Sequence, residues 1–304
     1  MNAAIRSIVR VGIDNGLKVY GVRCGYKGLF EGDYYRLYSK DVADKIMQGG
    51  TFLETSRFPG LHEDDIQAEV ARKVKEFGFG AVFVIGGNGS LRGAHALSAH
   101  GMSSIVLPGS IDNDIAGTEI SIGVDTALNT ILFAVDRIKD TASSHERTFI
   151  VEVMGRHSGW LALMGAIATG ADEAIIPECT FDLDALVKKI EKRREDGKKN
   201  TIILVAEGAM SGTVLMEKLQ GKIPYEVRLT ILGHIQRGGS PTAYDRILAS
   251  RLGRYAVEQY MMGNRNILVG FSGIAQTVLP LERVVNMVKP ASTEDLKTVR
   301  YLSL

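Results

Sequence analysis

Residues 105–114 read Ile-Val-Leu-Pro-Gly-Ser-Ile-Asp-Asn-Asp, an apolar run that ends in Pro-Gly and continues into two closely spaced carboxylates. Such a run predicts a buried strand that feeds a loop. Asp and Asn tolerate irregular loop backbone, so a plain turn is one interpretation. Phosphoryl transfer is the other, because one carboxylate can bind Mg²⁺ while the second accepts a hydroxyl proton.

A glycine-rich junction precedes this stretch. Residues 83–93 read Phe-Val-Ile-Gly-Gly-Asn-Gly-Ser-Leu-Arg-Gly, which predicts a strand, a tight turn and the start of a helix. Glycines let the backbone approach a phosphate, and a helix N-terminus offers free N–H groups. Ser90 also fits the N-cap of that helix, which is the structural alternative. The pattern is neither the dinucleotide fingerprint nor the Walker A loop, so another arrangement would hold any nucleotide.

Composition narrows the class of protein. The chain has 304 residues, enough for two domains or one large α/β unit, and a net charge of +1, which gives no reason to expect nucleic-acid binding. Cys24 and Cys179 form neither a metal cluster nor a disulfide framework, which fits a reducing cytoplasm. We find no signal peptide and no apolar stretch long enough to span a bilayer, so we expect a cytoplasmic protein without a membrane partner.

Strand-like and helix-like segments alternate along the chain. The predicted buried strands are residues 17–22, 81–85, 105–107, 149–153, 202–206 and 267–271. The predicted helices are residues 3–14, 66–77, 90–100, 126–139, 161–169, 183–194 and 244–262. Residues 141–145 are small and polar and fit a connector between lobes. The alternation predicts an α/β fold with mostly parallel sheets and helices on both faces. Ligands of such folds bind outside the carboxyl ends of the strands, so we expect the site there.

Several more short motifs occur along the chain. They are residues 1–6 (Met-Asn-Ala-Ala-Ile-Arg), 50–53 (Gly-Thr-Phe-Leu), 56–59 (Ser-Arg-Phe-Pro), 151–156 (Val-Glu-Val-Met-Gly-Arg) and 232–241 (Leu-Gly-His-Ile-Gln-Arg-Gly-Gly-Ser-Pro). With residues 84–87 and 107–114, they resemble the ATP-dependent 6-phosphofructokinase family of the bacterial type. The resemblance implies two lobes. Residues 1–123 and 236–286 would form the ATP-binding lobe, and residues 124–235 and 287–304 the fructose 6-phosphate-binding lobe.

The resemblance also implies roles for single residues. Asp112 would be the general base for the sugar 1-hydroxyl, Arg156 would lie near the transferring phosphoryl group, and Ser110 would be the third catalytic residue and also hold the sugar phosphate. Arg147 and Arg228 would reach the sugar phosphate of a neighbouring subunit of a homotetramer. The full set that would bind fructose 6-phosphate is Ser110, Asp112, Arg147, Met154, Gly155, Arg156, Glu207, Arg228, His234 and Arg237.

The same resemblance places ATP and its metal. The residues that would contact ATP are Arg57, Phe58, Gly87, Asn88, Gly89, Ser90 and Gly93. Asp114 and Asn88 would hold Mg²⁺. In pyrophosphate-using relatives an Asp occupies the position of Gly89 and a Lys that of Gly109, so the two glycines favour ATP.

Plain structural roles stay open for several of these residues. His234 can be an ordinary structural histidine, Glu207 can cap the next segment, and Arg147 and Arg156 can be surface charges. Phosphoryl transfer depends mainly on positioning and charge stabilisation, so arginines, Mg²⁺ and one base are the groups it requires. Arginine forks also suit phosphate oxygens better than lysine does.

The chain departs from the family in three ways. The family has a strand and a Gly-Gly-Asp-Ala-Pro-Gly loop before the methionine that is Met1 here, which a misassigned start, an incomplete gene or a shortened paralogue would explain. An Asp that helps to hold Mg²⁺ is replaced by the neutral Asn88. Arg6, Arg10, Asp172 and Lys198 fit an effector site for ADP or phosphoenolpyruvate, but Ser39, Lys139 and Asp196 stand where strongly regulated relatives carry basic residues. Ser39 and Asp196 carry no positive charge, which predicts weak regulation.

The main functional hypothesis is therefore Mg²⁺- and ATP-dependent conversion of fructose 6-phosphate into fructose 1,6-bisphosphate in glycolysis. The alternative is a catalytically impaired family member that binds sugar phosphate or assembles with an active subunit. Asn88 and the absent first strand favour the alternative, whereas the presence of Asp112, Asp114, Arg156, His234 and Arg237 favours the kinase.

Overall fold

The computed structural model describes residues 1–142 and 147–303 and divides the chain into two compact units. The first unit consists of Met1–Ser110, Ile115–Gly123 and Gly239–Val288. The second consists of Ile111–Asp114, Val124–Gly238 and Lys289–Leu304.

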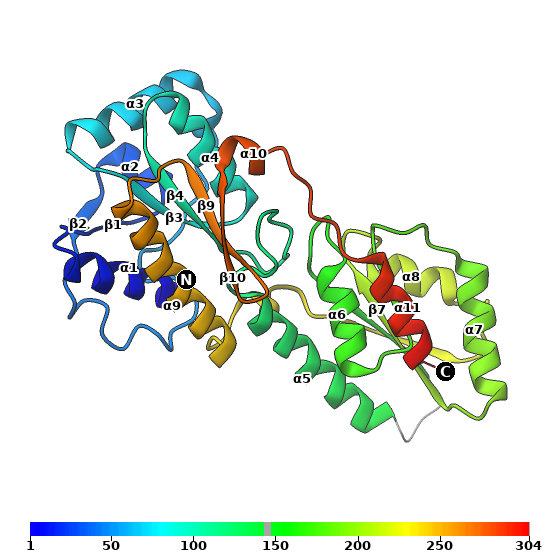
Figure 1. Cartoon of the computed structure of the whole chain (residues 1–304). Coiled ribbons are helices and arrows are strands. Elements are labelled where there is room, and N and C mark those ends of the chain that lie inside the picture. The colour runs from blue at the N-terminus through cyan, green and yellow to red at the C-terminus, as the bar shows by residue number, and fades with distance from the viewer. Residues whose placement is uncertain (143–146, 304) are drawn as a thin grey trace. The chain divides into compact units, whose positions relative to one another are not determined.

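The first unit is built on a four-stranded sheet in the order β10-β9-β4-β3 (Figure 1). Its strands are β3 (Val82–Gly86), β4 (Ser104–Pro108), β9 (Ile267–Ser272) and β10 (Ala275–Pro280). β3, β4 and β9 run parallel, and β10 pairs antiparallel with β9. A separate antiparallel pair joins β1 (Tyr20–Val22) to β2 (Tyr34–Arg36).

Alternating side chains of β4 explain why helices cover both faces of this sheet. Ile105 and Leu107 pack with α1 (Asn2–Asp14) and α9 (Ala243–Met261). Val106 packs on the other face with α4 (Asn88–Ala99) and α10 (Leu281–Val284). The remaining elements are α2 (Tyr26–Glu31), η1 (Pro59–His62) and α3 (Asp64–Glu76).

The second unit contains a parallel sheet in the order β6-β7-β5-β8. Its strands are β5 (Arg147–Val153), β6 (Glu173–Ile175), β7 (Asn200–Ala206) and β8 (Glu226–Ile231). One face packs against α5 (Val124–Ala142), α6 (Trp160–Thr169) and α11 (Thr293–Leu302). The other face packs against α7 (Leu183–Glu195) and α8 (Gly212–Leu219), and η2 (Gly233–Arg237) follows β8.

The fold confirms the predicted α/β class and corrects several details. Residues 17–22 do not form a buried strand of the main sheet, because only Tyr20–Val22 is a strand and it pairs with β2 alone. The predicted boundaries assigned residues 111–114 to the first lobe, whereas their contacts group them with the second unit. The connector predicted at residues 141–145 falls mainly on residues outside the described part, and α5 and β5, on its two sides, both belong to the second unit.

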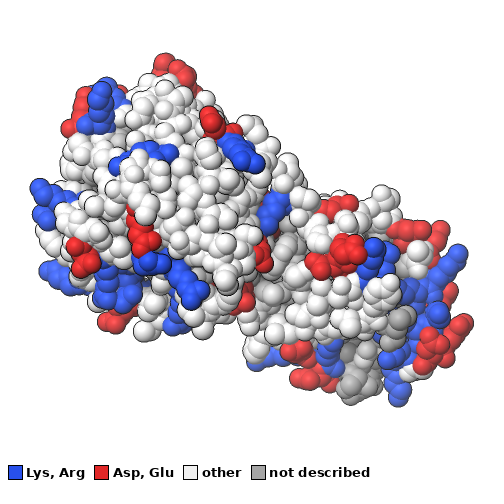
Figure 2. Space-filling view, in the orientation of Figure 1, with Lys and Arg blue, Asp and Glu red and all other residues white. Residues whose placement is uncertain are grey.

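Charged side chains of both signs are scattered over the face drawn in Figure 2, in keeping with the net charge of +1. Within residues 1–142 and 147–303, no helix is both long and apolar enough to cross a membrane. Cys24 and Cys179 are free thiols.

Candidate active site

Asp112 lies in the short segment of the second unit that follows β4. Ile111 packs against the core of this unit, and the Asp112 side chain is buried, with Oδ2 3.6 Å from Nε of Arg156. Burial is the main cause that raises the pKa of Asp112, and the charge of Asp114 adds to it, while Arg156 and Arg237 oppose the shift. A buried carboxylate with a raised pKa beside an arginine is suited to accept a proton.

The loop that carries Arg156 follows β5. Glu207, directly after the neighbouring strand β7, accepts hydrogen bonds through Oε1 from the N–H groups of Gly155 (3.3 Å) and Arg156 (3.0 Å). Arg156 has a φ of 52°, and a Cβ atom placed on Gly208 would lie only 1.7 Å from the carbonyl oxygen of Arg156. Glu207 and Gly208 therefore hold the Arg156 loop close to the end of β7.

The third part of the site is η2, which follows β8. His234 and Arg237 are exposed on it, whereas Gln236 is buried. Gln236 accepts a hydrogen bond from the N–H of Met154 at 3.2 Å and donates one to the carbonyl of Gly233 at 3.0 Å. Sequence reasoning missed Gln236, because nothing in the local sequence distinguishes it from its exposed neighbours. Its amide joins η2 to the loop that carries Met154 and Arg156. Asp112, Arg156, Glu207 and η2 all belong to the second unit.

Arg147 and Arg228 lie farther toward the start of the same strands. Arg147 pairs across the ladder with Glu226, and its Nε is 2.5 Å from Oε2 of that carboxylate. Arg228 forms an ion pair with the other oxygen of Glu226. β8 is the last strand of the sheet order β6-β7-β5-β8, so Arg228 lies on the edge strand and Arg147 on its neighbour β5. Glu226 is a further residue that the sequence did not single out.

The glycine junction of the first unit ends β3 and begins α4. Gly87 is the N-cap and Asn88 the first helical residue, so the alternative prediction of Ser90 as N-cap is wrong, and Ser90 lies in the first turn. A Cβ atom on Gly89 would meet nothing within 4 Å, and one on Gly87 would lie 3.7 Å from Cβ of Ser110. An open glycine turn at a helix N-terminus is typical of phosphate sites.

Gly93 lies within α4, whereas Phe58 is the N-cap of η1 and Arg57 precedes it. Gly93 is buried, and a Cβ atom there would lie 2.7 Å from the ring of Tyr26, whose hydroxyl donates to the carbonyl of Ser90 at 2.6 Å. Burial raises the pKa of Tyr26. Arg57 is exposed, and Phe58 stacks on Phe30 with ring centroids 5.4 Å apart. Gly93 thus lets Tyr26 brace the first turn of α4.

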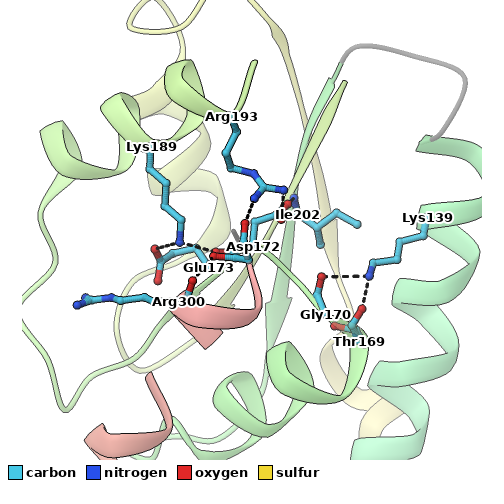
Figure 3. A network of polar contacts seen from close by, with 10 residues as sticks. Lys139, Thr169, Gly170, Asp172, Glu173, Lys189, Arg193, Ile202 and Arg300 are labelled. Atoms are coloured by element: carbon cyan, nitrogen blue, oxygen red, sulfur yellow. Dashed lines mark hydrogen bonds and ion pairs between the residues drawn. The ribbon is translucent and has the colours of Figure 1, made fainter. Parts of the chain in front are cut away.

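The positions matched to an effector site fall in both units. Arg6 and Arg10 lie on α1 of the first unit, and Asp172 and Lys198 lie in the second. The carboxylate of Asp172 is buried, is ion-paired with Arg193 and accepts the N–H of Ile202 at 2.7 Å (Figure 3). The ammonium of Lys139 donates to the carbonyls of Thr169 and Gly170.

A cavity of about 610 Å³ adjoins this network between β6, α7 and α11. Its lining includes the cationic side chains of Lys189, Lys192, Arg193, Lys198 and Arg300. Sequence reasoning missed Arg193, because its partner Asp172 lies on a different element and no local pattern links them.

The predicted Mg²⁺ ligands are the carboxylate of Asp114 and the side-chain amide of Asn88. Among residues 1–142 and 147–303, no group of three or more His, Cys, Asp or Glu side chains has an arrangement that could hold a metal ion. Mg²⁺ is commonly bound by one or two carboxylates together with water and substrate phosphates, so Asp114 fits a metal that arrives with a nucleotide.

The comparisons with known proteins concern the family of the whole chain. The family model described as Phosphofructokinase matches residues 1–260. An ATP-dependent 6-phosphofructokinase from Thermotoga neapolitana is 48% identical over 304 residues, which are 100% of this chain and 95% of the relative. Another from Listeria welshimeri is 49% identical over 304 residues, 100% of this chain and 94% of the relative.

Solved structures extend the likeness to the fold. Phosphofructokinase from Pichia pastoris in the T-state is similar with a TM-score of 0.88 and 32% identity, over 100% of this chain and 37% of that chain. A pyrophosphate-dependent phosphofructokinase from Marinobacter aquaeolei, with a TM-score of 0.83 and 20% identity over 96% of this chain and 82% of that chain, shares the fold. Together with the match over residues 1–260, these similarities show that the chain belongs to the phosphofructokinase family.

Proposed function

We propose that this protein is an ATP-dependent 6-phosphofructokinase, which transfers the γ-phosphoryl group of ATP to the 1-hydroxyl of fructose 6-phosphate. The observation that carries the proposal is the buried carboxylate of Asp112 beside Arg156, on a chain about half identical to enzymes of that name over its whole length. A base and a guanidinium held together are the groups that phosphoryl transfer to an alcohol requires.

In the proposed reaction, Asp112 accepts the proton of the sugar 1-hydroxyl. The bond between O1 and the γ-phosphorus forms, the bond between that phosphorus and the leaving oxygen of ADP breaks, and the proton on Asp112 later passes to solvent. Arg156 stabilises charge on the transferring group, and the N–H bonds from Gly155 and Arg156 to Glu207 keep this loop in place.

The remaining assignments are proposals that rest on the family. Ser110, Met154, Gly155, Glu207, His234 and Arg237 would hold the sugar phosphate, and Arg147 and Arg228 would reach that of a neighbouring subunit in a homotetramer. The glycine turn before α4, with Arg57 and Phe58, would hold ATP. Asp114 and Asn88 would hold Mg²⁺, which when bound neutralises charge on the ATP phosphates.

The direct test is formation of fructose 1,6-bisphosphate by the purified chain with ATP and Mg²⁺, with pyrophosphate as the competing donor. Turnover with ATP is the expected result, because Gly89 and Gly109 leave no acid or lysine to favour pyrophosphate. Turnover with pyrophosphate alone would contradict the donor assignment.

A catalytically impaired family member is the second candidate, and Asn88 is the observation that favours it. Its amide is neutral where the family has a carboxylate, which weakens the metal site. Binding of fructose 6-phosphate without turnover with either donor would support this candidate.

The acid limb of the pH profile should report the environment of Asp112. Because burial raises the pKa of this base, kcat/KM should fall with decreasing pH already above the usual range of an aspartate. Asp114 contributes to the increase, so Asp114→Asn should move the limb to lower pH even if it also lowers the maximal rate. A limb that stays in place in this variant would contradict the coupling between the two carboxylates.

Restoring the acid at position 88 should strengthen the metal site. In Asn88→Asp we expect the Mg²⁺ concentration for half-maximal activity to fall about 10-fold, the lower end of what neighbouring ligands contribute to metal affinity. Asn129→Asp on the exposed surface of α5 is the matched control and should leave the Mg²⁺ dependence unchanged. An equal response of both variants would show that general surface charge is responsible.

We also infer that the effector site to which the resemblance assigns Arg6, Arg10, Asp172 and Lys198 responds weakly to ADP or phosphoenolpyruvate. Asp172 is already ion-paired with Arg193, and the ammonium of Lys139 donates to backbone carbonyls, so both charges are engaged within the second unit. The saturation curve for fructose 6-phosphate should shift less than about 2-fold with phosphoenolpyruvate, well below typical allosteric coupling. A clear sigmoidal shift would contradict this inference.

A further inference from the structure

The segment of residues 289–291, here called the C-terminal strap, begins where the chain returns to the second unit after α10. Its first residue, Lys289, is half-buried and donates from Nζ to Oδ1 of Asn113 at 3.0 Å. The two residues are 176 positions apart in the chain. The strap therefore reaches the loop that carries Asp112 and Asp114 from a distant part of the sequence.

Asn113 is the residue whose backbone sets the course of this loop. It is 1% exposed and has a φ of 51°, which non-glycine residues adopt only when their surroundings support it. Asp112 and Asp114 are its direct neighbours, so the peptide planes on either side of Asn113 determine where both carboxylates point. A hydrogen bond to the Asn113 side chain thus acts on the orientation of the two acids.

The other end of the strap is attached, through Glu178, to the loop that carries Arg156. The N–H of Ala291 donates to Oε1 of Glu178 at 3.0 Å, and the same carboxylate accepts the N–H of Gly159 at 3.0 and 3.1 Å. Gly159 is the N-cap of α6 and directly follows the turn in which the N–H of Ser158 donates to the carbonyl of Gly155. The strap is therefore joined, through Glu178, to the loop that carries Arg156.

Pro290 separates the two attachment points and restricts the backbone between them. Both loops are thus tied to one short, stiff segment that lies outside the sheet strands from which they emerge. The 3.6 Å approach of Asp112 to Arg156 depends on how these two loops are held relative to each other. Displacements of about 1 Å between reacting groups can change a rate by about 100-fold.

We propose that Lys289 is a positioning residue for the general base, which acts through Asn113 to hold the Asp112–Asp114 loop against the Arg156 loop. The proposal rests on the phosphofructokinase function proposed above. It assigns Lys289 a role in the chemical step, without contact to either substrate, and gives Glu178 the corresponding role for the Arg156 loop.

The test compares Lys289→Met, which removes the donor and keeps most of the side-chain volume, with Lys289→Arg, which keeps a donor. In Lys289→Met we expect kcat to fall about 10- to 100-fold, while the Kd for fructose 6-phosphate and the Tm stay close to those of the unaltered protein. Lys289→Arg should recover most of the lost rate. Lys297→Met on α11, whose side chain is exposed and paired with Glu294, is the matched control and should keep full activity.

A double-mutant cycle separates action through Asn113 from a direct effect. If Lys289 acts through this side chain, Lys289→Met should cost little further rate in an Asn113→Ala background. Additive losses would overturn the proposed route, and an unchanged kcat in Lys289→Met would overturn the proposal itself.

Amide hydrogen exchange over residues 108–118 gives a readout that needs no turnover. Exchange should be faster in Lys289→Met than in the unaltered protein or in Lys297→Met, because the loop loses the hydrogen bond from Lys289. If the unaltered chain made no fructose 1,6-bisphosphate, the functional proposal would fail, while the exchange experiment would still decide whether Lys289 holds the loop. Equal exchange in all three proteins would refute the positioning role.

Discussion

Asp112→Ser is expected to lower kcat by about 10²- to 10⁴-fold, the usual contribution of a positioned general base. The serine hydroxyl cannot accept a proton at neutral pH. The substitution also removes the carboxylate charge that lies 3.6 Å from Nε of Arg156. Ground-state binding should change little, because the base acts mainly in the transition state. Initial rates with ATP, together with the Kd for fructose 6-phosphate measured without ATP, check both statements.

Asp184→Ser is the matched control for this change. Asp184 lies on α7, and its exposed side chain pairs with Lys222 at 3.0 Å, so its loss should leave kcat unchanged. A variant at Asp112 that loses sugar-phosphate affinity and keeps its kcat would refute the assignment of the base.

Gly208→Ala should be the most damaging small substitution near the site. A Cβ atom at this position would lie 1.7 Å from the carbonyl oxygen and 2.9 Å from the carbonyl carbon of Arg156, so the backbone of one of the two loops must move. Overpacking of this kind costs about 1–3 kcal/mol of unfolding free energy. The displaced Arg156 loop should also lower kcat/KM about 100-fold. Denaturant unfolding and steady-state kinetics measure the two effects.

Gly238→Ala provides the comparison in the same unit. Its φ is −105°, and the nearest atom to an added Cβ would be 3.9 Å away, so the substitution should be tolerated. Similar losses in both alanine variants would indicate that reduced backbone freedom, and not the close approach to Arg156, causes the defect.

The sequence was most informative where structure is local. The run 105–107 and the long periodic helices at residues 244–262 and 126–139 correspond to β4, α9 and α5, because a strand or helix pattern is repeated several times within each segment. Short elements such as β6 (Glu173–Ile175) and α10 (Leu281–Val284) were missed, because three or four residues carry too little periodicity. Their structure depends on neighbours in space.

The same division holds for the site. Asp112, Arg156 and Glu207 could be named from their positions after strands and from the family resemblance. Gln236, Glu226 and Lys289 could not, because each acts on a residue far away in the chain. Their partners become visible only when parallel strands and the returning C-terminal segment have brought the loops together.

The return of residues 289–303 to the second unit has a consequence for synthesis on the ribosome. Leu296 and Val299 of α11 fill the core next to the helices α5 and α6, so this unit lacks part of its interior until α11 has been translated. A nascent chain that ends before the strap would expose this apolar surface and leave the Asp112 loop without Lys289. Formation of the catalytic centre therefore requires that residues 289–303 have been synthesised, so products that terminate before residue 289 should aggregate or be degraded and should not act as partly active kinases.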